Sequence, residues 1–209
     1  MSKTKEKGLF FGTFNPIHVG HLIVANYMAE YTNLDEVWFV ITPHNPHKKK
    51  KSLLEDYHRH EMVEMALESY PKLKASTIEF GMPQPNYTVN TMVVLEEKYP
   101  NYRFSLIMGA DNLKSLHKWK NFEVLLKHYK IFVYPRISNQ EITDTLPEFE
   151  IEKTETTGIY KVEAPIIELS STFIRKAIAS KKEVRPMLSG KVWEYIDLMN
   201  FYKPKAKID

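Results

Sequence analysis

The apolar residues of this chain follow two different spacings that alternate along its length. Runs of consecutive apolar residues are typical of buried strands, and they occur at 9–11, 36–42, 75–79, 104–108, 131–134 and 166–169. Apolar residues three or four positions apart are typical of helices, and this spacing begins at Val19 and returns at 52–70, 88–99, 122–128, 172–180 and 190–200. The segment 139–157 is acidic and has no clear period.

This alternation predicts an α/β fold, with a mostly parallel sheet covered by helices on both faces and a C-terminal helical segment at about 170–200. The length of 209 residues fits one domain over 1–209 and is ample for a buried core. Ligands of such sheets bind beyond the carboxyl ends of the strands. Functional residues are therefore expected where the apolar runs end.

Composition narrows the range of partners. Hydrophobic residues make up 43% and charged residues 26%, as in an ordinary globular protein. The formal charge of +3 is too small to indicate nucleic acid. The absence of cysteine excludes disulfides, thiolate zinc sites and a cysteine nucleophile, and it fits a cytoplasmic protein. The polar N-terminus and the lack of an apolar run of about 18 residues predict neither a signal peptide nor a membrane partner.

The first candidate site is the string GTFNPIHVGH at 12–21, where a strand gives way to a helix. Gly12 ends the apolar run, and Asn15 and Pro16 make a tight connection. The N-terminus of a helix attracts phosphate, and His18 and His21, three residues apart, could become cationic donors when a nucleotide arrives. The alternative is that one histidine caps the helix and the other packs in the core.

A second helix start, ELSSTFIRKAI at 168–178, has similar chemistry. Ser170, Ser171 and Thr172 are good N-caps, and an apolar stripe holds the helix against the sheet. Arg175 points away from that stripe and could add a charged fork to a phosphate site. An ordinary capped amphipathic helix would explain the hydroxyls but leave Arg175 without a role.

Other strand ends carry weaker signals. Asp111 follows a buried run, and it could contact a ribose hydroxyl or cap the next turn. Thr88 could serve as a helix N-cap, and Trp119 has polar neighbours that indicate an edge position. The four lysines of 48–51 would ordinarily lie in a solvated loop, and a surface ion pair would explain Arg59.

Together these strings resemble the nucleotidyltransferase superfamily, which has an HxGH signature and an SSTxIR motif and releases pyrophosphate from ATP or CTP. GTFNPIHVGH, PNYT at 85–88 and GADN at 109–112 with a downstream HKW are similar to the bacterial nicotinate mononucleotide adenylyltransferase family, over about 8–195. The resemblance implies a Rossmann-like, doubly wound fold that joins nicotinate mononucleotide to ATP. It also implies Mg²⁺ that arrives with ATP, because no dedicated carboxylate cluster is evident in the sequence.

The resemblance also implies roles for individual residues. The catalytic candidates are His18, His21, Lys48 of the PHK element, and Arg175. The ATP-binding candidates are Gly12, Thr13, Phe14, Asn15, Gly20, Ser171 and Thr172. The nicotinate nucleotide candidates are Tyr87, Thr88, Gly109, Asp111 and Trp119, with Tyr87 and Trp119 at the pyridine ring. Arg59 resembles a family arginine, whereas the Arg-Pro-Gly turn of the family is replaced here by YPRI, so no adenine role is assigned to Arg136.

The expected reaction is an in-line attack by the phosphate of nicotinate mononucleotide on the α-phosphorus of ATP. Three alternatives remain open: a different acceptor, either the amidated nucleotide NMN or phosphopantetheine; a nucleotide-binding regulator without catalysis; and RNA binding through the lysine loop. Aromatic residues at 12% leave room for a homo-oligomer interface, which the sequence does not locate.

Overall fold

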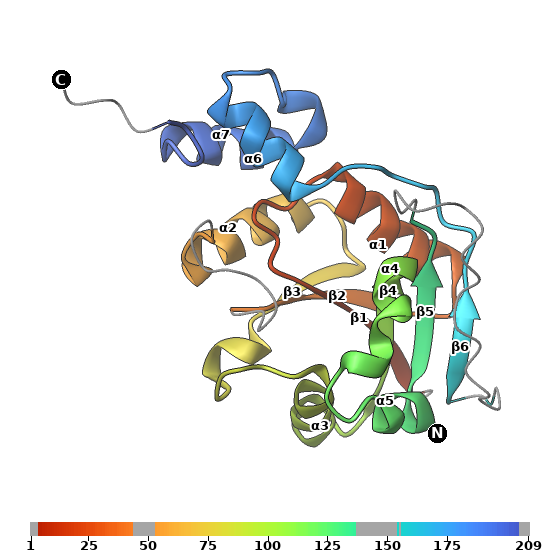
Figure 1. The fold of residues 1–209 in the computed structure, drawn as a ribbon. Coiled ribbons are helices and arrows are strands. Elements are labelled where there is room, and N and C mark those ends of the chain that lie inside the picture. The colour runs from red at the N-terminus through yellow and green to blue at the C-terminus, as the bar shows by residue number, and fades with distance from the viewer. Residues whose placement is uncertain (1–3, 44–52, 137–153, 155, 205–209) are drawn as a thin grey trace.

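A single parallel sheet forms the centre of the protein (Figure 1). The computed structural model describes residues 4–43, 53–136, 154 and 156–204, and everything below concerns these residues. The sheet order is β3-β2-β1-β4-β5-β6, and every neighbouring pair is parallel. The strands are β1 (Lys5–Gly12), β2 (Glu36–Ile41), β3 (Leu73–Ser76), β4 (Tyr102–Gly109), β5 (Lys130–Tyr134) and β6 (Gly158–Lys161).

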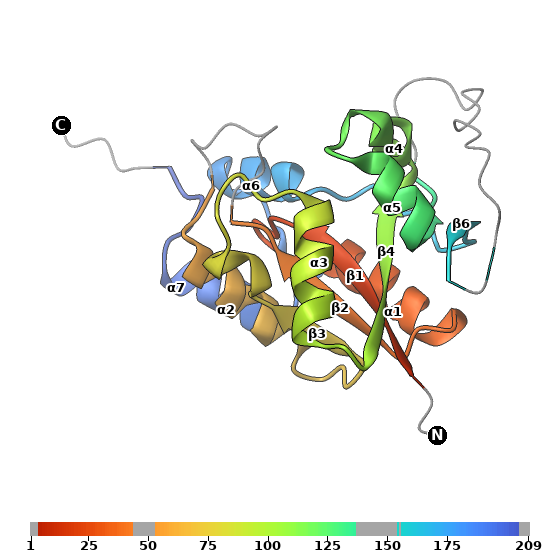
Figure 2. The same ribbon diagram turned by 90° about the horizontal axis from the view of Figure 1, so that it is seen from below.

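Helices cover both faces of this sheet (Figures 1 and 2). One face packs against α1 (Val19–Tyr31), α2 (Asp56–Leu67), α6 (Ser171–Ala179) and α7 (Gly190–Leu198). The other face packs against α3 (Thr88–Lys98), α4 (Ala110–Lys114) and α5 (Phe122–His128). Leu9 and Phe10, which are adjacent in β1, belong to the two different cores because strand side chains alternate between faces. The predicted doubly wound α/β fold is confirmed.

Three predicted elements differ from the structure. The expected last strand at 166–169 is not a strand, and the sheet instead ends with β6. Pro165 cannot donate a ladder hydrogen bond, and the chain from β6 runs across the top of the sheet to α6 (Figure 1). The run at 75–79 lies partly in β3 and partly in a 3-10 turn at Ile78–Gly81. The helix expected over 52–70 begins at Asp56, because Glu55 has an extended ψ of 147°.

The amino ends of the central strands are joined by a buried ion pair. Lys130 of β5 lies 3.1 Å from the Glu6 carboxylate of β1, and the Ser105 hydroxyl of β4 donates to the same carboxylate at 2.8 Å. The predicted C-terminal helical segment shares the core of α1 and α2, through Ile174 of α6 and Ile196 of α7. Within the described part of the chain, no helix combines the length and apolar character needed to cross a membrane.

Candidate active site

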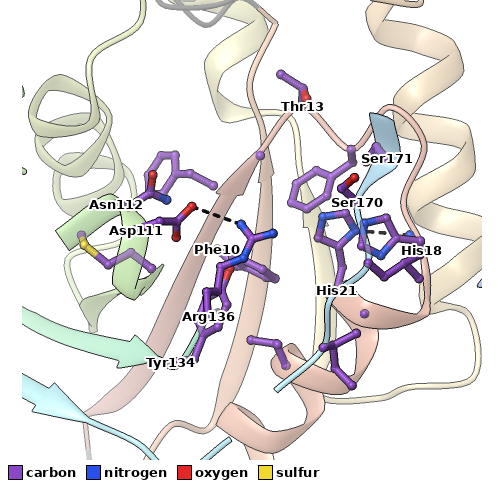
Figure 3. Close-up of a pocket in the computed structure, with 18 of the residues that line it drawn as sticks. Phe10, Thr13, His18, His21, Asp111, Asn112, Tyr134, Arg136, Ser170 and Ser171 are labelled. Carbon is purple, nitrogen blue, oxygen red and sulfur yellow. Dashed lines mark hydrogen bonds and ion pairs between the residues drawn. The ribbon is translucent and has the colours of Figure 1, made fainter. Parts of the chain in front are cut away.

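A cavity of about 720 Å³ lies at the carboxyl ends of β1, β4 and β5, beside the starts of α1 and α6 (Figure 3). This volume is within the range of about 300–1,000 Å³ that is usual for small-molecule sites. The predicted site residues among its lining are Gly12, Thr13, Phe14, Asn15, His18, Gly20, His21, Asp111, Ser171, Thr172 and Arg175. The structure therefore brings the two predicted helix starts together at one site.

The two histidines combine a structural role with a place at the cavity. His18 is the N-cap of α1, and its backbone N–H donates to Nδ1 of His21 at 3.2 Å. The imidazole rings are stacked, with centroids 3.7 Å apart. Because Nδ1 of His21 accepts a hydrogen bond, a neutral His21 ring carries its proton on Nε2. His21 therefore caps the start of α1 while its ring lines the cavity.

The surroundings of His18 favour its neutral form. Its side chain is only 4% exposed, and its Nδ1 has no hydrogen-bond partner among the described residues. Burial, and secondly the charge of Arg136, lower the pKa of His18 to about 4. The cationic role considered for this ring therefore requires a bound anion, which would favour the charged form.

The replacement His18→Asn is expected to change how stability depends on pH. Between pH 6.5 and about 4 the unfolded chain protonates this imidazole, whereas the folded protein does not. The wild type should therefore lose up to about 3 kcal/mol through this group as the pH falls across that window. Asparagine is a good N-cap that does not titrate. Urea unfolding of both proteins at about pH 7.5 and about pH 4.5 measures the difference, and parallel losses would contradict the assignment.

The glycines of the first motif make room for the aromatic and imidazole rings. A Cβ at Gly12 would lie 2.8 Å from Cζ of Phe14, and one at Gly20 would lie 3.1 Å from Nδ1 of His18. Phe14 has a left-handed φ of 44°, is 2% exposed and meets the ring of His21 edge-on at 5.1 Å. Phe14 thus supports the His21 ring from the core side of the cavity.

The second helix start reaches directly onto the first motif. Ser170 caps α6 by accepting the N–H of Phe173 at 3.2 Å, as predicted for an N-cap. The Ser171 hydroxyl donates to the carbonyl of Pro16 at 2.9 Å. Nη1 of Arg175 donates to the carbonyl of Asn15 at 2.6 Å. Arg175 therefore lines the cavity and also holds the loop that borders it.

Arg59 is not the surface residue that an exposed ion pair would require. It is 0% exposed, and its guanidinium donates to the carbonyls of Thr13 at 2.7 Å, Thr42 at 3.0 Å and Leu54 at 3.0 Å. It also pairs with Asp56. Burial is the larger effect and lowers the pKa of Arg59, and the Asp56 carboxylate offsets this only in part. This arginine links the chain leaving β1 to the chain leaving β2, beside the backbone hydrogen bond from Thr42 N–H to the carbonyl of Gly12 at 2.9 Å.

Asp111 faces Arg136, a residue to which the sequence assigned no role. The carboxylate and the guanidinium lie 3.3 Å apart at the cavity, across from the histidines (Figure 3). Asp111 lies inside the first turn of α4, whose N-cap is Gly109, so the capping alternative for Asp111 is wrong. A Cβ at Gly109 would lie 2.4 Å from Oδ1 of Asp111 and 2.8 Å from Cδ of Arg136. The place of Arg136 two residues after the end of β5 is the signal that could have identified it.

The remaining candidates do not line this cavity, although Gly109 lies next to Asp111 and Arg136, which do. Tyr87, Thr88, Gly109 and Trp119 are not among its lining residues. Tyr87 is itself the N-cap of α3, so Thr88 begins the helix and does not cap it. Nζ of Lys120 lies 4.5 Å from the centroid of the Tyr87 ring, which brings the segments around Tyr87 and Trp119 together. Lys48 lies outside the described residues.

A buried carboxylate supports the segment that carries Tyr87. Oε1 of Glu79 accepts the Thr91 hydroxyl at 2.6 Å, and the backbone carbonyl of Glu79 accepts Nδ2 of Asn86 at 3.3 Å. Burial raises the pKa of Glu79. The sequence did not identify this residue because it lies at the end of a run that reads as a strand.

The fold and the cavity together define a class of protein. A parallel sheet with two helix N-termini and an arginine converging at its carboxyl edge is typical of nucleotide-binding α/β proteins. Comparison with known families gives the assignment: the chain belongs to the cytidylyltransferase-like family, whose model matches residues 9–177.

Individual relatives agree with this membership. A protein of Christiangramia forsetii named "Probable nicotinate-nucleotide adenylyltransferase" is 60% identical over 95% of this chain and 99% of its own length. A protein of Flavobacterium psychrophilum with the same name is 59% identical over 94% of this chain and 98% of its own length. Plasmodium falciparum nicotinic acid mononucleotide adenylyltransferase, solved in complex with NaAD, shares the fold with a TM-score of 0.73 at 19% identity, over 95% of this chain and 97% of that one.

Proposed function

We propose that this chain is a nicotinate-nucleotide adenylyltransferase, which joins nicotinate mononucleotide to ATP and forms deamido-NAD and pyrophosphate in NAD biosynthesis. The proposal rests above all on the cavity that His18, His21 and Arg175 share. Relatives at 59% and 60% identity carry the name of this activity. Their names confirm the type of enzyme that the sequence predicted.

The reaction needs alignment and positive charge more than a base. The phosphate of nicotinate mononucleotide is already anionic near neutral pH, and it attacks the α-phosphorus of ATP. A new P–O bond forms as the bond to pyrophosphate breaks. A protein accelerates such a displacement by holding the reactants in line and stabilising the charge that develops on phosphate oxygens.

The proposed roles follow the positions of the cationic and donor groups. His21 donates from Nε2 to the α-phosphate, and His18 becomes cationic beside the triphosphate. Arg175 binds the departing pyrophosphate together with the N-terminus of α6. Asn15 and the backbone of 12–15 border the ATP, while Tyr87, Thr88 and Trp119 bind the nicotinate nucleotide. Lys48 is the fourth proposed source of positive charge for the reacting phosphates.

Magnesium is proposed to enter with ATP and to stay bound mainly to phosphate oxygens. Among the described residues no group of three or more His, Cys, Asp or Glu side chains could hold a metal ion. Asp111 is the one carboxylate among the described residues that line the cavity, and it is paired with Arg136. These residues fit a metal that the nucleotide supplies, which neutralises phosphate charge when it is bound.

A pyrophosphate-release assay across three acceptors tests the function. With ATP and Mg²⁺, nicotinate mononucleotide is expected to react faster than NMN, and phosphopantetheine is expected not to react. Arg175→Met should lower kcat/KM for ATP about 10- to 100-fold, because a charged hydrogen bond to phosphate is lost. Arg185→Met removes an exposed arginine that pairs with Glu183, and it should leave turnover unchanged.

Each alternative predicts a different result in this assay or in a binding measurement made beside it. Turnover with phosphopantetheine alone would make the chain a different adenylyltransferase. Binding of ATP without release of pyrophosphate, with any acceptor, would indicate a regulator. Tight, strongly salt-dependent binding of RNA would favour the lysine-loop hypothesis.

A further inference from the structure

The end of α7 is built to turn the chain back toward the cavity. Asn200 has a left-handed φ of 53°, its N–H donates to the carbonyl of Asp197 at 3.2 Å, and the N–H of Phe201 donates to the carbonyl of Ile196 at 3.0 Å. This pair of bonds is the Schellman motif, in which a residue such as asparagine ends a helix and reverses the chain. The Schellman motif therefore sets the direction in which the chain continues from Phe201 to Tyr202.

Two side-chain contacts hold this reversal in place. The ring of Phe201 packs against His58 of α2, with centroids 4.8 Å apart. Nζ of Lys203 lies 2.7 Å from Oδ1 of Asp197. Tyr202, between them, has a left-handed φ of 64°. The contacts of its two chain neighbours, Phe201 and Lys203, thus fix the position of Tyr202.

Tyr202 bonds a residue of the first motif that lies 187 positions earlier in the chain. Its hydroxyl donates to Oδ1 of Asn15 at 2.7 Å, and the backbone N–H of Leu54 donates to the same oxygen at 3.4 Å. Because both donors meet Oδ1, the orientation of the Asn15 amide is set. Asn15 lines the cavity, so this orientation decides which amide atoms face a ligand there.

The same asparagine is held through its main chain by α6. Arg175 donates to the carbonyl of Asn15, at 2.6 Å, while Tyr202 holds its side chain. Burial raises the pKa of Tyr202, although the charges of Arg175 and Arg59 lower it, so the phenol keeps its proton for donation. Two residues from the C-terminal part of the chain, Arg175 and Tyr202, therefore hold the loop at Asn15 in place.

We propose that Tyr202 is a positioning residue for ATP, which acts through Asn15 and does not touch the substrate itself. The role rests on the proposed function. It makes the short segment after α7 part of the ATP site, and it explains why the helix ends in a structured reversal. A merely structural tyrosine would contribute to stability but would not change ATP recognition.

The test compares Tyr202→Phe with Tyr195→Phe. Tyr195 lies on α7 and its hydroxyl bonds Nδ1 of His58 at 2.8 Å, so both variants lose one hydroxyl and one hydrogen bond. We expect Tyr202→Phe to raise the KM for ATP about three- to ten-fold, with a KM for nicotinate mononucleotide that stays within about two-fold. Tyr195→Phe should change neither. Equal kinetics for both variants would overturn the proposal.

A double-mutant cycle tests whether Tyr202 acts through Asn15. Once Asn15→Ala has removed the amide, adding Tyr202→Phe should have no further effect on the KM for ATP. Additive effects would show that the hydroxyl acts by another route, and they would overturn the proposed role.

Binding of a non-hydrolysable ATP analogue separates this proposal from the function. Measured by calorimetry, Tyr202→Phe should weaken binding of the analogue about three- to ten-fold, and Tyr195→Phe should leave the binding affinity unchanged. If the wild type binds the analogue but releases no pyrophosphate, the proposed function fails and this comparison still decides the role of Tyr202. If the wild type does not bind the analogue, both proposals fail.

Discussion

Replacing His21 with alanine is expected to lower kcat about 100- to 1,000-fold while the protein stays folded. The ring of His21 lines the cavity and is held by stacking on His18 at 3.7 Å and by edge contacts with Phe10 and Phe14. Its Nδ1 is occupied by the His18 N–H, so the Nε2 proton is the one that can meet the α-phosphate. A donor that is fixed before the substrate arrives is worth most when charge develops on that oxygen.

The alanine variant also loses a helix cap, so a second variant is needed to separate the two effects. His21 is the third residue of α1, where glutamate commonly accepts the N-cap N–H in a capping box. His21→Glu should therefore keep the cap and the stability, but its charge repels phosphate. We expect its kcat to be at least as low as that of His21→Ala.

Stopped-flow or steady-state release of pyrophosphate measures both variants, and urea unfolding monitors the cap. Loss of the cap should cost His21→Ala about 1 kcal/mol, which is too little to unfold an ordinary domain. If His21→Ala turned over at the wild-type rate, the histidine would serve only as a helix cap. Full activity in His21→Glu would have the same meaning.

The sequence predicted the sheet and the two helix starts because their signals are local. The strand ending at Gly12 and the helix beginning near Val19 follow from a change of period within a few residues. The Ser170 cap follows from residue type. That both starts meet at one cavity follows from a general property of parallel sheets, whose ligands collect at the carboxyl edge.

What the sequence did not predict depends on contacts between distant segments. Nothing local to Arg59 shows that its guanidinium also bonds the carbonyls of Thr13 and Thr42, which lie 46 and 17 residues earlier in the chain. The same is true of Tyr202, whose partner lies 187 residues away. Arg136 was passed over because its turn departs from the family pattern, yet the end of β5 delivers it to the cavity in any case. Apolar runs also predict strands that do not form, as at 166–169. Whether such a run becomes a strand depends on a neighbouring strand with which it can pair.

Arg59→Met is expected to destabilise the protein by about 3 to 5 kcal/mol, the largest stability change among the variants considered. Methionine fills a similar volume but donates no hydrogen bond. The carbonyls of Thr13, Thr42 and Leu54 would then lose their shared donor inside the core, where an unsatisfied polar group is costly. The Asp56 carboxylate would lose its ion-pair partner as well. Arg59→Lys should recover little, since a single ammonium cannot match a planar fork that bonds several segments at once.

The chemical midpoint of unfolding distinguishes this central role from that of an ordinary arginine. Arg185→Met, which removes an exposed arginine, should leave the midpoint almost unchanged, because exposed ion pairs contribute little. In the folded fraction of Arg59→Met we also expect a lower kcat/KM for ATP, since Thr13 lines the cavity and depends on Arg59 for its backbone position. An Arg59→Met midpoint equal to that of Arg185→Met would show that water or other donors satisfy the three carbonyls. The positions of Thr13 and Thr42, which follow β1 and β2, would then not depend on this guanidinium.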